Sequence, residues 1–249
     1  MGIKRKLRRI LGLFGLYRRS NVLAFFVDYT RAAKRLRLEP KEAADEAHRA
    51  GTWNFDNPLE REWQQHVLAT VSAQTGTARW GDVLEVGCSE GVFTAQLAAR
   101  CNSVTAYDIS PVAAARAAER CQPCGNVRIC QVDVATQEIE GQYDMVFVMD
   151  ILWLVVGKER KASIVPKLVH ALRDGGLLIF SDSRMPKSIR HPFWSLFFPS
   201  GADEWAKRLE RAGGLAVARK ECYPAHGRSI PEFWAKLFVL FRKQPASGA

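Results

Sequence analysis

The stretch from Asp82 to Thr94 constrains the fold more than any other part of this sequence. It reads Asp-Val-Leu-Glu-Val-Gly-Cys-Ser-Glu-Gly-Val-Phe-Thr, so a short apolar run meets two glycines and then a helical pattern. We expect a buried strand at residues 83–86 and a turn in which Gly87 and Gly91 let the backbone bend sharply and approach a ligand. The helix that follows points its backbone amides at this turn. The pattern therefore predicts an α/β fold with a ligand-binding turn.

Three further apolar runs each end beside an acidic residue. They occupy residues 103–107, 127–132 and 143–149 and lead into Asp108, Asp133 and Asp150. The carboxyl ends of parallel strands share one edge of a sheet, so we expect these acids and Glu85 to surround one crevice. Asp108 follows Gly87 by 21 residues, a spacing at which an acid accepts the ribose hydroxyls of an adenosine cofactor.

A simpler explanation is that these aspartates cap the helices that follow them, since aspartate is a favoured capping residue. For Asp150 this explanation competes on equal terms with a binding role. For Gly87, Gly91 and Asp108 together, two independent features of the adenosine-binding pattern coincide, which favours a cofactor site. A further helix is predicted at residues 111–120, with Ser110 as its cap.

These residues resemble the class I S-adenosylmethionine-dependent methyltransferases. Their first motif is an acidic residue followed by G-x-G-x-G, which stands here as Glu85-Val-Gly-Cys-Ser-Glu-Gly91, with Ser89 in place of the usual middle glycine. The resemblance implies S-adenosyl-L-methionine as cofactor and S-adenosyl-L-homocysteine as product. It places Gly87 at the methionine part, Asp108 at the ribose and Asp133 near the adenine amino group. The cofactor-binding residues expected from it are Trp53, Glu85, Gly87, Cys88, Ser89, Gly91, Asp108, Ile109, Asp133, Val134 and Asp150.

The resemblance also implies the architecture, a Rossmann-like three-layer α/β sandwich. Its seven-stranded sheet is mostly parallel and has an antiparallel C-terminal strand. The remaining expected elements are helices at 158–173 and 203–212, a turn at 173–176, and strands at 177–181, 215–223 and 235–242. A Rossmann dehydrogenase fits less well, because its glycine spacing is G-x-G-x-x-G and a closing antiparallel pair is not expected of it.

Within this family the sequence is most similar to the nodulation protein S (NodS) type. The similarity lies in the stretch Trp53–Trp63, the glycine turn and the residues 148–153. NodS enzymes N-methylate the free amine of a deacetylated chitooligosaccharide, which implies a small-molecule N- or O-acceptor here, such as a sugar amine or a glycolipid. It also implies that Trp53 and Phe55 help to close the cofactor site, with core packing as the competing role. Three rival functions stay open: a non-catalytic adenosyl-binding protein, a membrane-surface partner protein, and an RNA or protein methyltransferase.

Methyl transfer from a sulfonium is an in-line displacement, so the protein mainly has to position the nucleophile and exclude water. An amine must lose its proton before it attacks, and Asp150, His191 and His226 are the candidate bases. The two histidines are equally typical of surface loops, whereas His66 and His170 are expected to be structural. The aromatic segment 185–200 is interpreted either as a lid over the acceptor or as packing against the N-terminal helices.

The charge is concentrated at the N-terminus. Residues 1–40 contain eleven Lys or Arg and two acidic residues, which accounts for +9 of the net charge of +10. The nearly neutral remainder argues against a nucleic-acid substrate, which needs many basic contacts. Apolar residues three or four apart within residues 1–17 predict an amphipathic helix. Its role is left open between a structural cap, peripheral membrane contact through residues 1–20, and nucleic-acid contact.

We therefore divide the chain into a basic helical extension (1–49), a methyltransferase domain (50–243) and a flexible tail (244–249). No run of roughly 18 apolar residues and no secretory signal is present, so a cytoplasmic protein, peripheral at most on the inner membrane surface, is expected. The six cysteines suit reduced thiols. The lone Cys121-x-x-Cys124 pair lacks the four ligands of a structural zinc site, so no metal is expected. Nothing in the sequence indicates the oligomeric state.

Overall fold

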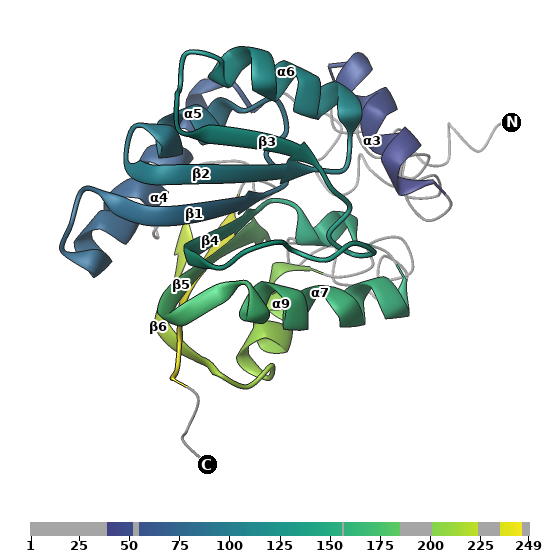
Figure 1. The fold of residues 1–249 in the computed structure, drawn as a ribbon. Coiled ribbons are helices and arrows are strands. Elements are labelled where there is room, and N and C mark those ends of the chain that lie inside the picture. The colour runs from purple at the N-terminus through teal and green to yellow at the C-terminus, as the bar shows by residue number, and fades with distance from the viewer. Residues whose placement is uncertain (1–38, 52–54, 156, 185–200, 224–234, 246–249) are drawn as a thin grey trace, which may run out of the picture.

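The computed structural model describes residues 39–51, 55–155, 157–184, 201–223 and 235–245, and these form one α/β sandwich (Figure 1). Its centre is a seven-stranded sheet in the order β3-β2-β1-β4-β5-β7-β6. The strands are β1 (Trp80–Val86), β2 (Cys101–Asp108), β3 (Val127–Gln131), β4 (Tyr143–Met149), β5 (Leu172–Ser183), β6 (Leu215–Tyr223) and β7 (Lys236–Lys243). Only β7 runs antiparallel to its neighbours, β5 and β6. The predicted seven-stranded, mostly parallel sheet with an antiparallel C-terminal strand is confirmed.

Helices cover both faces of the sheet. They are α3 (Pro40–Arg49), α4 (Pro58–Thr75), α5 (Val92–Ala98), α6 (Pro111–Cys121), α7 (Lys158–His170) and α9 (Ala202–Glu210), with a 3₁₀ turn η2 (Leu152–Leu154). Alternate strand residues point to opposite faces, which separates two apolar cores. One core holds buried residues of α4 and α5, and the other those of α7 and α9. The third layer of the predicted sandwich is thus present.

Local sequence signals explain why several helices begin where they do. The Asn57 side chain accepts hydrogen bonds from the amides of Leu59 and Glu60, both at 3.1 Å, and Pro58 occupies the first helical position of α4. Ser110 caps α6 in the same manner, since its hydroxyl accepts the amide of Ala113 at 3.1 Å. The predicted cap of this helix is therefore confirmed.

The helix predicted over residues 158–173 ends earlier, at His170, and in this the prediction was wrong. Leu172 already pairs with Tyr143 of β4, and the next pair is Met145 with Leu177, so residues 173–176 bulge out of β5. The turn expected there is this bulge. Strand pairing and the burial of Leu172 in the core outweigh the helical pattern at this point.

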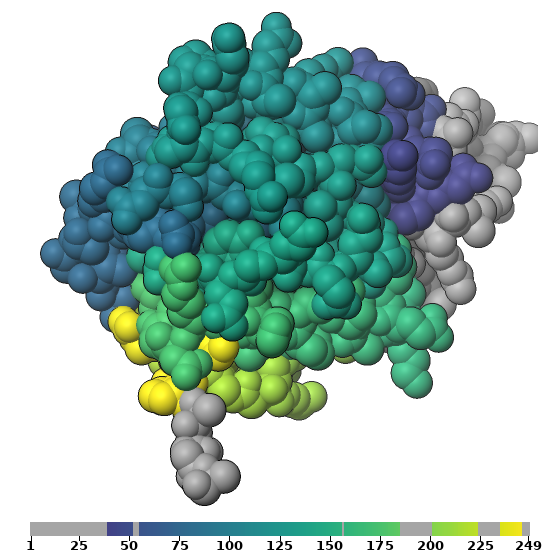
Figure 2. Space-filling model, viewed as in Figure 1, coloured from purple at the N-terminus to yellow at the C-terminus, as the bar shows by residue number. Residues whose placement is uncertain are grey.

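Helix α3 packs against α6 and forms part of the same surface (Figures 1 and 2). The Ser110 hydroxyl donates a hydrogen bond to the Asp45 carboxylate, and Arg116 donates to the backbone carbonyl of His48 at 2.9 Å. The rest of the basic segment, residues 1–38, and the aromatic segment 185–200 lie outside the described residues. None of the helices in the described ranges is long and apolar enough to cross a membrane.

Candidate functional site

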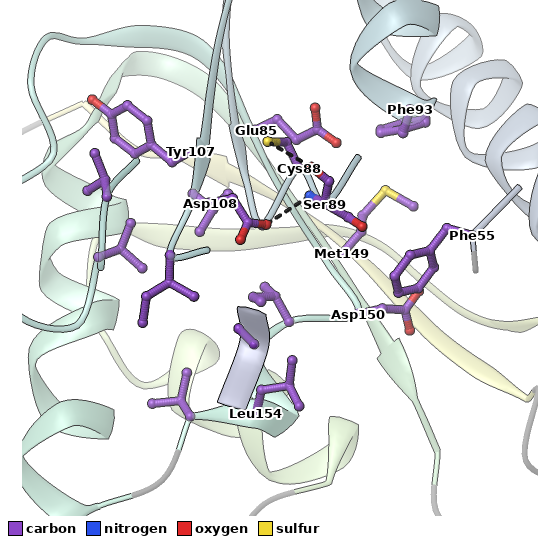
Figure 3. Close-up of a pocket in the computed structure, with 18 of the residues that line it drawn as sticks. Phe55, Glu85, Cys88, Ser89, Phe93, Tyr107, Asp108, Met149, Asp150 and Leu154 are labelled. Atoms are coloured by element: carbon purple, nitrogen blue, oxygen red, sulfur yellow. Dashed lines mark hydrogen bonds between the residues drawn. The ribbon is translucent and has the colours of Figure 1, made fainter. Parts of the chain in front are cut away.

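A pocket opens at the edge of the sheet where the parallel strands end, beside the glycine turn (Figure 3). The structure brings together there most of the residues that the sequence predicted, namely Glu85, Gly87, Cys88, Ser89, Asp108, Ile109, Asp133, Val134 and Asp150. Gly91, which was also expected to bind the cofactor, is the N-cap of α5 and is not among the residues that line this pocket. Trp53, His191 and His226 lie outside the described residues.

The turn depends on three left-handed residues, Gly87, Ser89 and Gly91, with φ angles of 81°, 50° and 77°. A Cβ atom at Gly91 would lie 3.0 Å from the Cα of Ala117, so only glycine allows α6 to pack this closely. Ser89 adopts the conformation that favours glycine, which explains why a glycine is usual at this place in the motif. Its backbone amide donates a hydrogen bond of 2.8 Å to Asp108.

Asp108 is buried at the end of β2 and faces the turn. Its two carboxylate oxygens accept the amides of Ser89 and Ser110, at 2.8 and 2.9 Å. Burial raises the pKa of Asp108, while the two amides and the nearby His48 act in the opposite direction. Each carboxylate oxygen has a second lone pair, so the side chain, fixed in orientation by two amides, can still accept two hydroxyls.

Glu85 lies beneath the turn at the end of β1, with 6% of its surface exposed. The hydroxyl of Thr94 donates a 2.6 Å hydrogen bond to its carboxylate. Burial raises the pKa of Glu85 to about 7, and the charge of Asp108 adds to this effect. Near neutral pH this carboxyl group therefore exists in both protonation states.

Asp133 is held in a bidentate ion pair. Arg160 on α7 donates to both of its carboxylate oxygens, at 2.9 and 3.0 Å, and the Ala135 amide donates to one of them at 3.1 Å. The hydrogen bond from the Ala135 amide is of the kind that aspartate commonly makes with the backbone two residues further along. Asp133 therefore acts in part as a local capping residue, which was the simpler explanation for the acids at the strand ends. Arg160 also lines the pocket and fixes the orientation of the acid that follows β3.

Phe55 and Asp150 lie next to each other at the end of the pocket away from Tyr107 (Figure 3). Asp150 has a positive φ of 54° and accepts a 2.5 Å hydrogen bond from the buried ammonium of Lys236. Lys236 also donates to Glu60 of α4 at 3.1 Å. The predicted base Asp150 is thus in the pocket, but it is paired with a cation.

Two comparisons with known proteins bear on the family. A family model described as Nodulation protein S (NodS) matches residues 39–195, which is more than half of the chain. The chain belongs to the NodS family. The nodulation protein S of Rhizobium tropici is 31% identical over 133 residues, which cover 53% of this chain and 55% of that protein. The chain thus spans about half the length of this NodS relative.

A second relative and a solved structure extend the comparison. A ubiquinone biosynthesis O-methyltransferase of Nitrosomonas europaea is 29% identical over 172 residues, covering 66% of this chain and 69% of that protein. The crystal structure of the N-methyltransferase NodS from Bradyrhizobium japonicum WM9, in complex with S-adenosyl-L-homocysteine, superposes with a TM-score of 0.67 at 23% identity. It covers 80% of this chain and 98% of that one, which shows that the NodS fold is shared.

The sequence analysis missed several pocket residues of this NodS chain, namely His48, Glu60, Gln64, Trp153 and Arg160. Glu60 had a readable signal, because it lies one turn from the buried Gln64 and three residues from the buried Trp63 on the inward face of an amphipathic helix. His48 had no such signal in the sequence, because it lies within residues 1–49, which the basic composition of the N-terminus led us to assign to a helical extension. In the described residues, no group of three or more His, Cys, Asp or Glu side chains is arranged so that it could hold a metal ion.

Proposed function

We propose that this protein is an S-adenosylmethionine-dependent methyltransferase that acts on the nitrogen of a small-molecule amine. The observation that carries the proposal is the pair formed by the glycine turn and Asp108 at the carboxyl edge of the sheet. A carboxylate oriented by the amides of Ser89 and Ser110, with lone pairs left over, suits the two hydroxyls of a ribose. Membership of the NodS family supports the same conclusion.

The residues present fit this cofactor. We assign the methionine part to the backbone around Gly87, the ribose to Asp108 and the adenine side to Asp133, Ile109 and Val134, all of which line one pocket. When bound, the cofactor supplies a methyl group on a sulfonium that a nucleophile displaces in line. The chain's own residues then have to hold the acceptor in line and keep water out. Phe55 and Trp153 provide apolar surface for this purpose at the end of the pocket where Phe55 and Asp150 lie, which we call the acceptor end.

An amine is the acceptor that we favour, because acidic side chains, Glu60 and Asp150, gather at that end of the pocket. The solved NodS relative is an N-methyltransferase by its printed description. We take the amine of a deacetylated chitooligosaccharide as the first acceptor to test, with a glycolipid amine as the next. Transfer to oxygen is the alternative, and it is supported by the ubiquinone biosynthesis O-methyltransferase among the relatives.

We also propose that the methyltransferase domain begins before α3 rather than at residue 50. His48 and Ala44 of α3 line the pocket, and Asp45 is tied to the cap of α6. The NodS match begins at residue 39, which supports this boundary.

The test is methyl transfer itself. The purified protein is incubated with isotopically labelled cofactor and a deacetylated chitooligosaccharide, and the product is examined by mass spectrometry. We expect a labelled methyl group on nitrogen, and none when the amine is acetylated. Label on oxygen would favour the alternative, and cofactor binding without product from amine or hydroxyl acceptors would favour a non-catalytic adenosyl-binding protein.

A further inference from the structure

Four ionisable side chains, three of them from different helices and strands, meet beneath the acceptor end of the pocket. They are Glu60 of α4, Asp150 after β4, Asp182 of β5 and Lys236 of β7. The Lys236 ammonium is 2.5 Å from Asp150 and 3.1 Å from Glu60, and the side chains of Lys236 and Glu60 are each 4% exposed. Lys236 thus contacts two acids directly, and Asp182 interacts electrostatically with both Asp150 and Lys236. Such an excess of acids in a buried place favours the uptake of a proton.

Lys236 does not interact equally strongly with the acids around it. It lies closer to Asp150 than to Glu60, so Asp150 is the acid that it stabilises most as an anion. Burial raises the pKa of Glu60, and the charge of Asp150 acts in the same direction, against the effect of Lys236. Burial likewise raises the pKa of Asp182 well above its usual range, and the charge of Asp150 acts in the same direction. Of the two acids of this cluster that line the pocket, Glu60 is therefore the one whose pKa is raised toward the uptake of a proton.

We propose that Glu60 accepts the proton of the acceptor's ammonium group, and that Lys236 is a positioning residue that keeps Asp150 as a fixed anion beside it. This inference rests on the function proposed above. In the step, one N–H bond of the ammonium breaks, its electron pair stays on nitrogen as the attacking lone pair, and an O–H bond forms on a Glu60 oxygen. Asp150 then orients the amine while it remains in its ion pair with Lys236.

Two other assignments make different predictions. If Asp150 were the base, taking a proton would break its 2.5 Å ion pair with the buried ammonium of Lys236. If Glu60 only joined α4 to β7 through Lys236, its replacement would lower activity by the same factor at every pH. The dependence on pH therefore separates a proton acceptor from a structural link.

The experiment compares Glu60→Gln with Glu62→Gln, an identical change two residues further along α4, where the carboxylate is exposed and accepts the Tyr223 hydroxyl at 3.0 Å. The probe is the deacetylated chitooligosaccharide, bound first without cofactor and followed by calorimetry at pH 7. We expect Glu60→Gln to weaken this binding by about tenfold or more, as for the loss of a charged hydrogen bond. Glu62→Gln is expected to stay within about twofold, and both variants to bind S-adenosyl-L-homocysteine like the wild type.

The second readout is kcat at pH 7 and pH 9. At pH 7 we expect Glu60→Gln to lower kcat by about a hundredfold or more, the usual contribution of a proton acceptor. At pH 9 an amine with an ammonium pKa of about 8 is already neutral in solution, so the deficit should shrink to about tenfold or less. Equal deficits at both pH values, or none, would overturn the inference while leaving the methyltransferase function intact.

The outcomes stay distinguishable in two further cases. If Glu60→Gln does not fold, as judged by its melting curve, Glu60→Asp takes its place, and its shorter carboxylate, which reaches the ammonium less well, should lower the rate more at pH 7 than at pH 9. A rate that falls by the same factor at both pH values would then contradict the proposal. A wild-type protein that binds the cofactor but methylates no amine would instead refute the proposed function, and this inference with it.

Discussion

Ser89 holds a left-handed backbone conformation that costs an ordinary residue about 1 to 2 kcal/mol. Its φ is 50°, and its amide is aimed at Asp108 by this conformation. The serine therefore preserves the turn that glycine usually makes at this place in the motif. The serine that replaces the usual glycine at position 89 changes the energy of the turn. It leaves the hydrogen bond from the turn to Asp108 in place.

The titration of the Glu85 carboxyl group makes the free energy of unfolding depend on pH. Its pKa is about 7 in the folded protein, against 4.5 for an ordinary glutamate. Between these values the folded protein keeps a proton that the unfolded chain has released. The contribution of protonated Glu85 to the free energy of unfolding is therefore complete below pH 4.5 and lost by about pH 7. The change is about 3 kcal/mol.

Replacing Glu85 by Gln removes this dependence, since glutamine cannot ionise and can still accept from Thr94. We expect the free energy of unfolding of Glu85→Gln to exceed that of the wild type by an increasing margin as the pH rises from 4.5 to 7, and by a constant margin above. Urea denaturation of both proteins at matched pH values measures the difference. Parallel curves for the two proteins would show that Glu85 does not titrate in this range.

At the scale of elements, α5 and α6 pack through the backbone of Gly91. A methyl group there would meet both the Cα and the Cβ of Ala117, at 3.0 and 3.1 Å. Gly91→Ala should therefore destabilise the protein by about 2 to 4 kcal/mol, as backbone strain adds to overpacking. Gly76→Ala is the control, because Gly76 has a similar φ of 69° with no atom within 4 Å of the added carbon. If Gly91→Ala and Gly76→Ala lost equal amounts of unfolding free energy in denaturant, the close α5–α6 contact would contribute nothing to the cost of the Gly91 substitution.

The strands, the glycine turn and Asp108 could be predicted because their signals are local. Apolar runs, glycines and a fixed spacing all occur within the segment that they describe. The pairing of Glu60 with Lys236 spans 176 residues and arises only when α4 packs against β7. Asp150 lines the pocket, yet its lysine partner depends on the same tertiary contact. The contribution of α3 to the pocket was hidden by the basic composition around it.

At the scale of the whole molecule, the basic residues are concentrated within residues 1–40 of the sequence, and the rest of the chain is nearly neutral. We propose that residues 1–20 contact anionic membranes. The full-length protein should then float with vesicles that contain anionic lipid, and a chain that begins at Glu39 should not. Roughly 1 kcal/mol per basic residue near the surface is lost when salt screens the charge, so high salt should release the protein. Equal flotation of both chains would contradict membrane contact through this segment.

Calorimetry with S-adenosyl-L-methionine tests most directly whether the pocket beside Asp108 binds the adenosyl cofactor. We predict binding by the wild type and a loss of about tenfold or more in Asp108→Ala, as expected for charged hydrogen bonds worth about 1.5 to 3 kcal/mol. Asp174→Ala serves as the control, because Asp174 is exposed and pairs with Lys243. No binding by the wild type, or unchanged affinity in a folded Asp108→Ala variant, would contradict the assignment.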